Sequence, residues 1–290
     1  MNPALQPLIS AAPRTADSSI GGLLLASGKI TPESAERVLR MQKELGIRFG
    51  EAAQRLGLVT EADIQQVLAR QFDYPYLQQG EGKYSDKLIA AYQPFSPQVE
   101  TLRAIRSQLM LRWMALGRKS LVVVGVNDGD GTSLFAANLA VVFSQLGEQT
   151  LLVDANLRNP SQHEIFGLAG RQGLSDILAG RAERDVITRI ESFVDLSVLG
   201  AGTLPPNPQE LLSRPAFSAL RTELESSYDV VLYDSAAFSL GSDALALAAR
   251  TGGVLLVARK NHTPVGDINA MTEQMLHSGA QVVGSVLVDF

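Results

Sequence analysis

The sequence predicts an α/β protein with a doubly wound, mostly parallel sheet, preceded by a small all-helical domain built from a tandem repeat. Three observations lead to this prediction. From Ser120 onward, apolar runs of four to six residues alternate with helical patterns, as in a buried parallel sheet with crossover helices. A glycine-rich turn follows the first of these runs and opens a helix. Before residue 72, the sequence instead repeats itself at an offset of 29 residues.

Length and composition bound the domain organisation and the class of protein. The 290 residues are enough for two domains, and 46% hydrophobic with 19% charged residues is typical of a folded, soluble protein. A net charge of -5 disfavours binding of nucleic acid through a basic surface. The absence of cysteine excludes disulfides, thiolate metal sites and cysteine nucleophiles, and it fits a reducing cytoplasm.

The N-terminus lacks the features of a targeting segment. Residues 1–18 have neither a basic start nor an unbroken apolar core, so they do not read as a signal peptide, and we expect them to be disordered. The longest uncharged run, 131–147, is too short and too polar to span a bilayer. We therefore expect a cytoplasmic protein that reaches the inner membrane only by recruitment through a partner.

Residues 19–76 form the predicted helical repeat domain. Each copy reads as a short apolar helix, a glycine stop and a threonine N-cap that opens a second helix. In the two second helices, apolar residues recur on one face and each stripe ends in a glutamine, which suggests a polar contact. Seven residue pairs match between the copies: Gly21 and Gly50, Gly28 and Gly57, Ile30 and Val59, Thr31 and Thr60, Ala35 and Ile64, Leu39 and Leu68, Gln42 and Gln71.

A change in composition and periodicity marks the boundary between the domains. Residues 77–98 carry glycines, prolines and polar residues without a sustained period, and we predict that they form a linker. Ser96 and Pro97 then supply the N-cap and the first-turn proline of a helix leading into the second domain, 99–290. Three charged residues share one face of this helix, as on a solvated, salt-bridged surface: Glu100, Arg103 and Arg106.

Six strands are predicted in the second domain, at residues 120–126, 149–153, 196–199, 229–233, 253–258 and 281–288. In a doubly wound sheet, ligands bind beyond the carboxyl ends of the strands. The residues that follow each strand are therefore the candidates for a functional site.

The first of these positions holds the segment GVNDGDGTS, residues 125–133. A glycine-rich turn from strand to helix points backbone amides and a helix N-terminus into one concavity, which suits phosphate. The segment departs from the GxxxxGK[ST] pattern, because Thr132 stands where the lysine is expected. Ser133 remains available to bind magnesium.

Acidic residues follow two other strands. LLVDANLR places Asp154 and Asn156 at the sheet edge with Arg158 behind them, and VVLYDSAA places Asp234 there. A single aspartate at a strand end is more often a helix cap or a loop bond. Two carboxylates facing a glycine-rich turn suit a magnesium nucleotide, since hard cations take oxygen ligands and bridge phosphates.

Residues 95–288 resemble the cytoplasmic domain of the bacterial tyrosine kinases, or BY-kinases, that accompany capsule and exopolysaccharide chain-length control. Glu100, Arg103 and Arg106 fit the ExxRxxR oligomerisation motif of that family, and GVNDGDGTS occupies its Walker A position. LLVDANLR fits the Walker A′ pattern hhhDxDxR, and VVLYD fits Walker B. PPNPQELLSRPAF, at 205–217, is similar to a family segment that partition ATPases lack. The chain resembles the soluble, exopolysaccharide chain-length-determinant type.

The resemblance implies a fold of the P-loop NTPase type, with ATP and magnesium as cofactors. It implies catalytic roles for Asp154, Asn156 and Asp234, and a metal site formed by Ser133, Asp154 and Asp234, with Asp154 orienting magnesium or taking the tyrosine proton. It also implies a homo-oligomeric ring through the ExxRxxR helix and a membrane chain-length determinant, or polysaccharide co-polymerase, as partner. The implied nucleotide-binding residues are Asn127, Asp128, Gly129, Asp130, Gly131, Thr132, Ser133 and Arg158.

Four departures from the family pattern bear on catalysis. Thr132 replaces the Walker A lysine, and Asn156 replaces the second Walker A′ aspartate. Ala236 and Ala237 replace prolines after Walker B, and no tyrosine follows Tyr233. The hypothetical substitutes for the missing C-terminal phosphorylation targets are Tyr74, Tyr76, Tyr84 and Tyr92.

Three functions remain open. The first is a tyrosine autokinase and ATPase that controls exopolysaccharide chain length, polymerisation and export. The second is a catalytically weak or inactive relative, a pseudokinase that binds nucleotide or partners and regulates the polysaccharide polymerase as an oligomer. The third, a partition or positioning ATPase, ranks last because the chain lacks the signature lysine near the start of Walker A and contains PPNPQELL.

Residues 19–71 are similar to the N-terminal domain of type II secretion and pilus-assembly ATPases, whose tandem motif binds cyclic di-GMP in some members. Arg48 begins the second copy as that motif requires, whereas Ser19 stands at the equivalent place in the first copy. Gln54 stands where a leucine or similar residue is expected. The alternative is a purely structural or docking domain. The residues implied for cyclic di-GMP are Gly21, Gln42, Arg48, Gly50 and Gln71.

Overall fold

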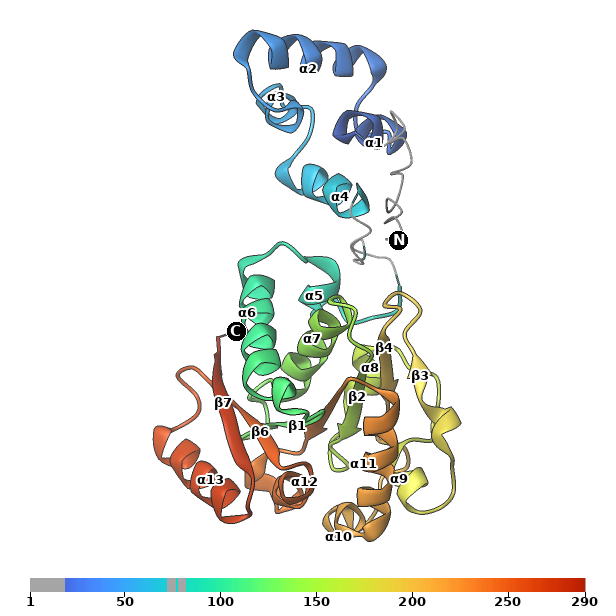
Figure 1. Cartoon of the computed structure of the whole chain (residues 1–290), viewed down its shortest axis with the longest axis vertical. Coiled ribbons are helices and arrows are strands. Elements are labelled where there is room, and N and C mark those ends of the chain that lie inside the picture. The colour runs from blue at the N-terminus through green and yellow to red at the C-terminus, as the bar shows by residue number, and fades with distance from the viewer. Residues whose placement is uncertain (1–18, 72–76, 78–81, 290) are drawn as a thin grey trace, which may run out of the picture. The chain divides into compact units, whose positions relative to one another are not determined.

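The computed structural model describes residues 19–71, 77 and 82–289 (Figure 1). The chain divides into two compact units, residues 1–74 and 75–290. The predictions for residues 1–18, Tyr74 and Tyr76 lie outside the described residues.

The described part of the first unit consists of helices, and hydroxyl side chains begin three of them. Ser19 accepts a hydrogen bond from the Gly22 amide, Thr31 from the Ser34 amide and Thr60 from the Asp63 amide. Thr31 and Thr60 are the N-caps that the repeat pattern predicts. Buried apolar side chains from all four helices form the core of this unit. The helices are α1 (Ile20–Ala26), α2 (Pro32–Leu45), α3 (Phe49–Arg55) and α4 (Glu61–Gln71).

The second unit contains a seven-stranded sheet in the order β3-β4-β2-β5-β1-β6-β7. Neighbouring strands are parallel except β3 and β4, which pair antiparallel. The doubly wound fold class is confirmed, and the ends of the six predicted strands differ from the observed ones by at most two residues. β3 was not predicted, because its two residues are exposed and carry no apolar run. The strands are β1 (Ser120–Gly125), β2 (Thr150–Ala155), β3 (Thr188–Arg189), β4 (Leu196–Leu199), β5 (Val230–Ser235), β6 (Gly253–Arg259) and β7 (Gln281–Val288).

Helices cover both faces of this sheet (Figure 1). Successive residues of β1 point to opposite faces, so that Leu121 and Val123 join one buried apolar cluster and Val122 and Val124 join another. α5, α6 and α7 pack on the first face, and α9 to α13 pack on the second. The helices are α5 (Ile89–Tyr92), α6 (Pro97–Arg112), α7 (Thr132–Ser144), α8 (Gln162–Ile165), α9 (Leu174–Leu178), α10 (Pro208–Ser213), α11 (Pro215–Ser227), α12 (Asp243–Thr251) and α13 (Val265–His277).

The predicted linker, 77–98, falls instead within the second unit, which begins at residue 75. Leu88, Ala90 and Ala91 are fully buried in the first apolar cluster. The Ala90 amide donates to Asn138 Oδ1 on α7 at 2.8 Å. The prediction was wrong here because the apolar segment is short and lies between polar residues and prolines, so that the sequence shows no periodic pattern from which its burial could be predicted. α6, by contrast, begins where Ser96 and Pro97 predict.

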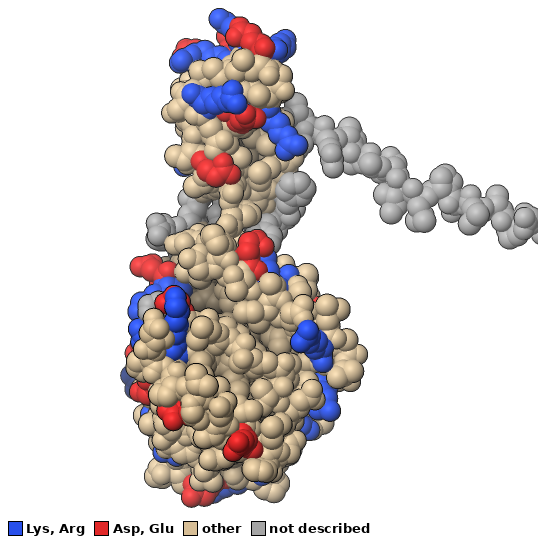
Figure 2. Space-filling view, turned by 90° about the vertical axis from the view of Figure 1, so that its left-hand side faces the viewer, with Lys and Arg blue, Asp and Glu red and all other residues tan. Residues whose placement is uncertain are grey.

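None of the helices in the described ranges has both the length and the apolar character needed to cross a bilayer. On the face of the second unit that Figure 2 shows, Lys and Arg lie interspersed with Asp and Glu over a largely uncharged surface.

Candidate functional site

The glycine-rich turn between β1 and α7 is a phosphate-type loop in its backbone geometry. Gly129 and Gly131 have φ values of 84° and 78°, which only glycine adopts readily, and Gly131 is the N-cap of α7. A Cβ atom on Gly125 would lie 2.2 Å from Thr132 Oγ1, so the Thr132 hydroxyl lies directly against the end of β1. The first amides of α7 have no acceptor within the helix, so they could bind an anion, and Thr132 stands at the position of the expected lysine.

Asp130 anchors this loop to the segment between β6 and α13. Its carboxylate is fully buried, and Oδ2 accepts a hydrogen bond from the Asn127 amide at 2.8 Å. Oδ1 accepts a bond from Thr263 Oγ1 at 3.0 Å and lies 3.2 Å from His262 Nδ1. Arg259 donates to the Gly129 carbonyl at 3.4 Å. Asp130 is among the predicted nucleotide-binding residues, and its carboxylate makes its contacts within the protein.

Asp154 and Asp234 are register partners on the adjacent strands β2 and β5, and both are fully buried. Asp154 Oδ2 accepts from the amides of Ser161 at 3.1 Å and Gln162 at 3.0 Å, and Oδ1 accepts from the amide of Asn156 at 3.3 Å. Burial, and after it the negative charge of Asp234, raises the pKa of Asp154 well above its usual range. Burial also raises the pKa of Asp234, and Gln162 and the nearby Ser133 side chain counteract that rise.

The oxygen atoms of this cluster fit a hard cation such as magnesium. Among the described residues, none offers a hydrogen bond to the buried atoms Asp234 Oδ1 and Gln162 Oε1. A buried oxygen without a donor costs about 1 to 3 kcal/mol, which a bound cation would offset. Ser133, Asp154 and Asp234, the three predicted ligands, therefore lie in one cluster that has free oxygen positions.

Gln162 belongs to this cluster and was missed in the sequence. It is the first residue of α8, and its Nε2 donates to Asp234 Oδ2 at 2.8 Å and to the Ser133 carbonyl at 2.9 Å. No spacing rule marks it, because it lies in the loop region after β2 and reaches the cluster only in the folded chain.

Two other predicted site residues, Asn156 and Arg158, make contacts within the protein. Asn156 closes a turn with Asn159, donating to its carbonyl at 2.8 Å and accepting from its amide at 3.0 Å. Arg158 forms an ion pair with Asp243 through Nε and through Nη2, the latter at 3.2 Å. The guanidinium of Arg158, predicted to bind nucleotide, is therefore held by a carboxylate on α12.

The predicted oligomerisation residues lie on α6. Glu100 is exposed and pairs with Arg103. Arg106 Nη1 donates to the Val142 carbonyl at 2.6 Å, so this side chain also joins α6 to α7.

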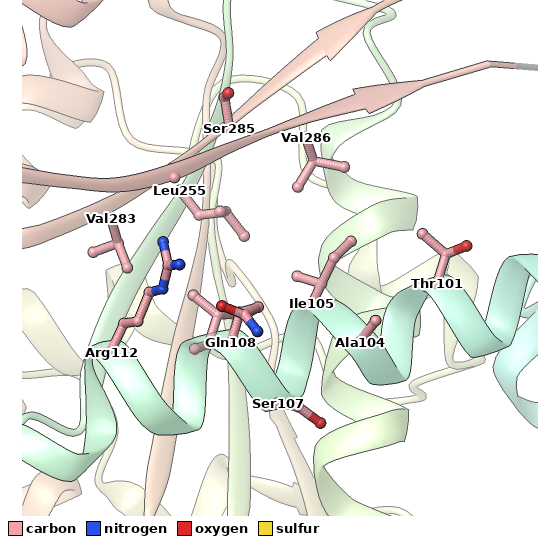
Figure 3. A pocket seen from close by; sticks show the side chains of 12 residues that line it. Thr101, Ala104, Ile105, Ser107, Gln108, Arg112, Leu255, Val283, Ser285 and Val286 are labelled. Atoms are coloured by element: carbon pink, nitrogen blue, oxygen red, sulfur yellow. The ribbon is translucent and has the colours of Figure 1, made fainter.

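A pocket of about 480 Å³ lies between α6 and the edge strand β7 (Figure 3). Thr101, Ile105 and Gln108 line it from α6, and Val283 and Val286 line it from β7. None of the predicted site residues lines it.

In the first unit, packing explains both glycines of the predicted cyclic di-GMP set. A Cβ atom on Gly21 would lie 3.1 Å from the Phe49 ring, and one on Gly50 would lie 3.1 Å from Ile64. Arg48 is exposed at the N-cap of α3. The two glutamines of the set are Gln42, which is half-buried, and Gln71, which is exposed.

Two of the four hypothetical phosphorylation targets lie in the described part of the chain, and the hydroxyl of each has a hydrogen-bond partner. Tyr84 Oη lies 3.1 Å from Ser192 Oγ, and Tyr92 donates to the Tyr84 carbonyl at 3.3 Å. Partial burial raises the pKa of the Tyr92 hydroxyl.

Comparisons with known proteins relate the chain to bacterial tyrosine kinases. No protein-family model matches the chain. It is 35% identical over 204 residues to the putative tyrosine-protein kinase EpsB of Ralstonia solanacearum, covering 70% of this chain and 27% of that protein. It is 32% identical over 194 residues to the putative tyrosine-protein kinase CapB of Staphylococcus aureus, covering 67% of this chain and 85% of that protein.

The solved kinase domain of the Escherichia coli tyrosine kinase ETK superposes on 72% of this chain and 82% of its own, with a TM-score of 0.69 and 28% identity. This likeness confirms the predicted P-loop type of fold for the second unit. The chain spans about a quarter of the length of EpsB, with 27% of that protein matched.

Proposed function

This chain belongs to the family of bacterial tyrosine kinases, and from this premise we propose that its second unit is a magnesium-dependent ATPase and tyrosine autokinase of an exopolysaccharide system. One observation carries the proposal. Asp154 and Asp234 lie side by side at the carboxyl ends of neighbouring strands, and a buried oxygen of Asp234 has no donor among the described residues. An aspartate pair with an open oxygen position suits a magnesium nucleotide.

Each residue of the cluster has a distinct role in the proposed reaction. Backbone amides between Asp128 and Thr132 bind phosphate oxygens at the start of α7, since the Asn127 amide already donates to Asp130 Oδ2. Ser133 and Asp234 hold magnesium, which neutralises the phosphate charge that develops during transfer. Asp154, which lies at the end of β2 beside Asp234, takes the proton of the tyrosine hydroxyl.

Thr132 favours a second candidate, a weak or inactive kinase that acts as an oligomeric regulator of the polysaccharide polymerase. The hydroxyl of Thr132 lies against Gly125 and cannot supply the positive charge of a lysine. A charge-assisted contact to phosphate contributes about 1.5 to 3 kcal/mol, so its loss weakens ATP binding about ten- to a hundredfold.

Calorimetry with the full chain tests both candidates. Magnesium ATP is titrated into the wild type and into Thr132→Lys, and phosphate transfer from ATP to the protein is measured in parallel. Transfer by the wild type that Asp154→Asn abolishes supports the kinase. Binding without transfer supports the regulator. If neither the wild type nor Thr132→Lys binds at about 1 mM, nucleotide is not a ligand of this unit, the kinase fails, and only a regulator that binds partners alone remains.

The assembly and location of the protein are part of the same proposal. The ring forms through the α6 face that carries Glu100, and a membrane chain-length determinant recruits the cytoplasmic protein to the inner membrane. The first unit regulates this assembly, with cyclic di-GMP as the proposed ligand at Arg48 and its neighbours.

A further inference from the structure

Gln162 connects three segments of the aspartate cluster. Its side chain is fully buried. Its amide Nε2 donates to the Ser133 carbonyl at 2.9 Å and to Asp234 Oδ2 at 2.8 Å. Its backbone amide donates to Asp154 Oδ2 at 3.0 Å. One residue thus holds the start of α7, the end of β2 and the end of β5 in a single arrangement.

The orientation of the Gln162 amide follows from its partners. A backbone carbonyl and a carboxylate oxygen are both acceptors, so the group that faces them is the NH2 and not the oxygen. Oε1 is therefore not bonded to either of these two partners. Within the described structure it is buried and has no hydrogen-bond donor.

Two buried oxygens without donors, Gln162 Oε1 and Asp234 Oδ1, belong to side chains that are hydrogen-bonded to each other. Unsatisfied buried acceptors are rare in folded proteins and destabilise them. Carboxylate and amide oxygens are the ligands that a hard cation prefers, and these two belong to side chains that lie next to the second carboxylate, Asp154.

We propose that Gln162 is a positioning residue of the magnesium site, whose Nε2 fixes Asp234 and the start of α7 and whose Oε1 is an additional oxygen donor to the cation's coordination shell. The proposal rests on the proposed magnesium-dependent function. It adds to that function a residue outside the three Walker motifs.

The test measures metal binding directly. Mn²⁺, as a paramagnetic probe for magnesium, is titrated into the full chain with ADP present, and unbound Mn²⁺ is counted by electron paramagnetic resonance. An identical titration without protein corrects for Mn²⁺ bound to ADP. Gln162→Met keeps the length of the side chain but removes both polar atoms. Gln162→Glu keeps Oε1 and replaces the donating NH2 group with a second oxygen.

Gln162→Met is expected to weaken Mn²⁺ binding about tenfold or more, because partners of metal ligands typically contribute about ten- to a hundredfold in affinity. Gln162→Glu is expected to lower the melting temperature without metal, since it removes the two Nε2 hydrogen bonds and adds a third carboxylate, and Mn²⁺ with ADP is expected to raise its melting temperature by more than that of the wild type. Gln145→Met is the matched control, because the Gln145 side chain also donates to a backbone carbonyl, that of Ala90, at 3.0 Å.

Mn²⁺ affinity equal in the wild type and Gln162→Met would overturn the inference and leave the proposed function standing. Absence of Mn²⁺ binding by the wild type would overturn both. Should Gln162→Met fail to fold, as circular dichroism would show, Gln162→Glu decides: a melting temperature that Mn²⁺ and ADP raise no more than that of the wild type contradicts the role of Oε1, and a larger rise supports it.

Discussion

Arg158 and Asp243 form a two-point ion pair that joins the loop after β2 to the first turn of α12. The two side chains are unequally buried, with 35% of Arg158 but only 2% of Asp243 exposed. The hydrogen bond from Arg158 to Asp243 raises the pKa of the guanidinium. The pair therefore holds an arginine of the Walker A′ motif through a carboxylate that water does not reach.

The unequal burial predicts unequal effects of removing each partner. Arg158→Ala leaves a buried, unpaired carboxylate and is expected to lower the free energy of unfolding by about 3 kcal/mol. Asp243→Ala leaves an arginine that can turn into water and is expected to lower it by about 1 to 2 kcal/mol. Urea denaturation measures both.

Arg171→Ala is the control for this pair, because Arg171 is exposed. The double variant is expected to lose less than the sum of the single variants. Equal losses for the two single variants would contradict the argument from burial.

Asp234→Asn is expected to stabilise the protein in the absence of magnesium at neutral pH. Burial raises the folded-state pKa of Asp234 above its value in the unfolded chain. The contribution of such a group to stability is present below the unfolded pKa and is lost as the pH rises through the folded pKa. The amide has no charge to bury, so the gain is about 1 kcal/mol or more.

Thermal unfolding in a chelator at about pH 4 and about pH 8 measures this gain. The advantage of Asp234→Asn should appear at the higher pH and disappear at the lower one. An advantage of the same size at both pH values would show that the charge of Asp234 is not its cause. In magnesium and ADP the order should reverse, because the variant lacks a metal ligand.

Asp63 is expected to make the stability of the first unit fall at acid pH. Lys29 Nζ lies 2.7 Å from Asp63 Oδ1, and Oδ2 accepts a bond from the Thr60 amide at 2.9 Å. The hydrogen bonds from Lys29 and Thr60 lower the pKa of Asp63 to about 2. A lowered pKa contributes stability above the unfolded value of 3.8 that is lost as the pH falls through about 2.

Hydrogen exchange of the α4 amides in the full chain, followed by mass spectrometry, measures this loss of stability at α4. Their protection, corrected for the intrinsic rate, should fall from about pH 5 to about pH 2 in the wild type and much less in Asp63→Asn. Glu33→Gln, an exposed position on α2, should behave like the wild type. Equal acid sensitivity in the wild type and Asp63→Asn would contradict the assignment.

The proposed ring is best tested at Glu100 and not at Arg106. Arg106 Nη1 donates to the Val142 carbonyl at 2.6 Å, so Arg106→Ala is expected to lower the melting temperature as well as any self-association. Glu100 is exposed, and Glu100→Arg should abolish association with the fold intact, because it places like charges in the contact. Sedimentation velocity and thermal unfolding separate the two effects. An unchanged sedimentation profile for Glu100→Arg would remove this face as the interface.

The proposed binding of cyclic di-GMP to the first unit is expected to depend on Arg48. Arg48 is exposed at the start of α3, where it can reach a phosphate or a guanine. Arg48→Ala should weaken binding about ten- to a hundredfold in calorimetry with the full chain. Arg40→Ala, an exposed arginine on α2, is the control. Equal loss in both variants would indicate only general attraction of an anion.

Local patterns in the sequence were sufficient to predict most of the second unit. The six strands and the start of α6 were predicted because apolar runs, hydroxyl caps and first-turn prolines act over a few residues. The convergence of Asp154 and Asp234 was also predictable, since parallel strands bring their carboxyl ends to one edge. The segment around α5 was not predictable, because its burial depends on Asn138 and the rest of α7.

The sequence by itself determined the fold class, the phosphate-type loop and the two aspartates, because each follows from periodicity or from a strand end. Only the tertiary structure decided that Asp130 bonds Thr263, that Arg158 pairs with Asp243, and that Gln162 bonds Ser133 and Asp234. These contacts join residues between 29 and 133 positions apart. Their geometry depends on how loops from different strands pack at one edge of the sheet, and no local pattern of residues encodes that packing.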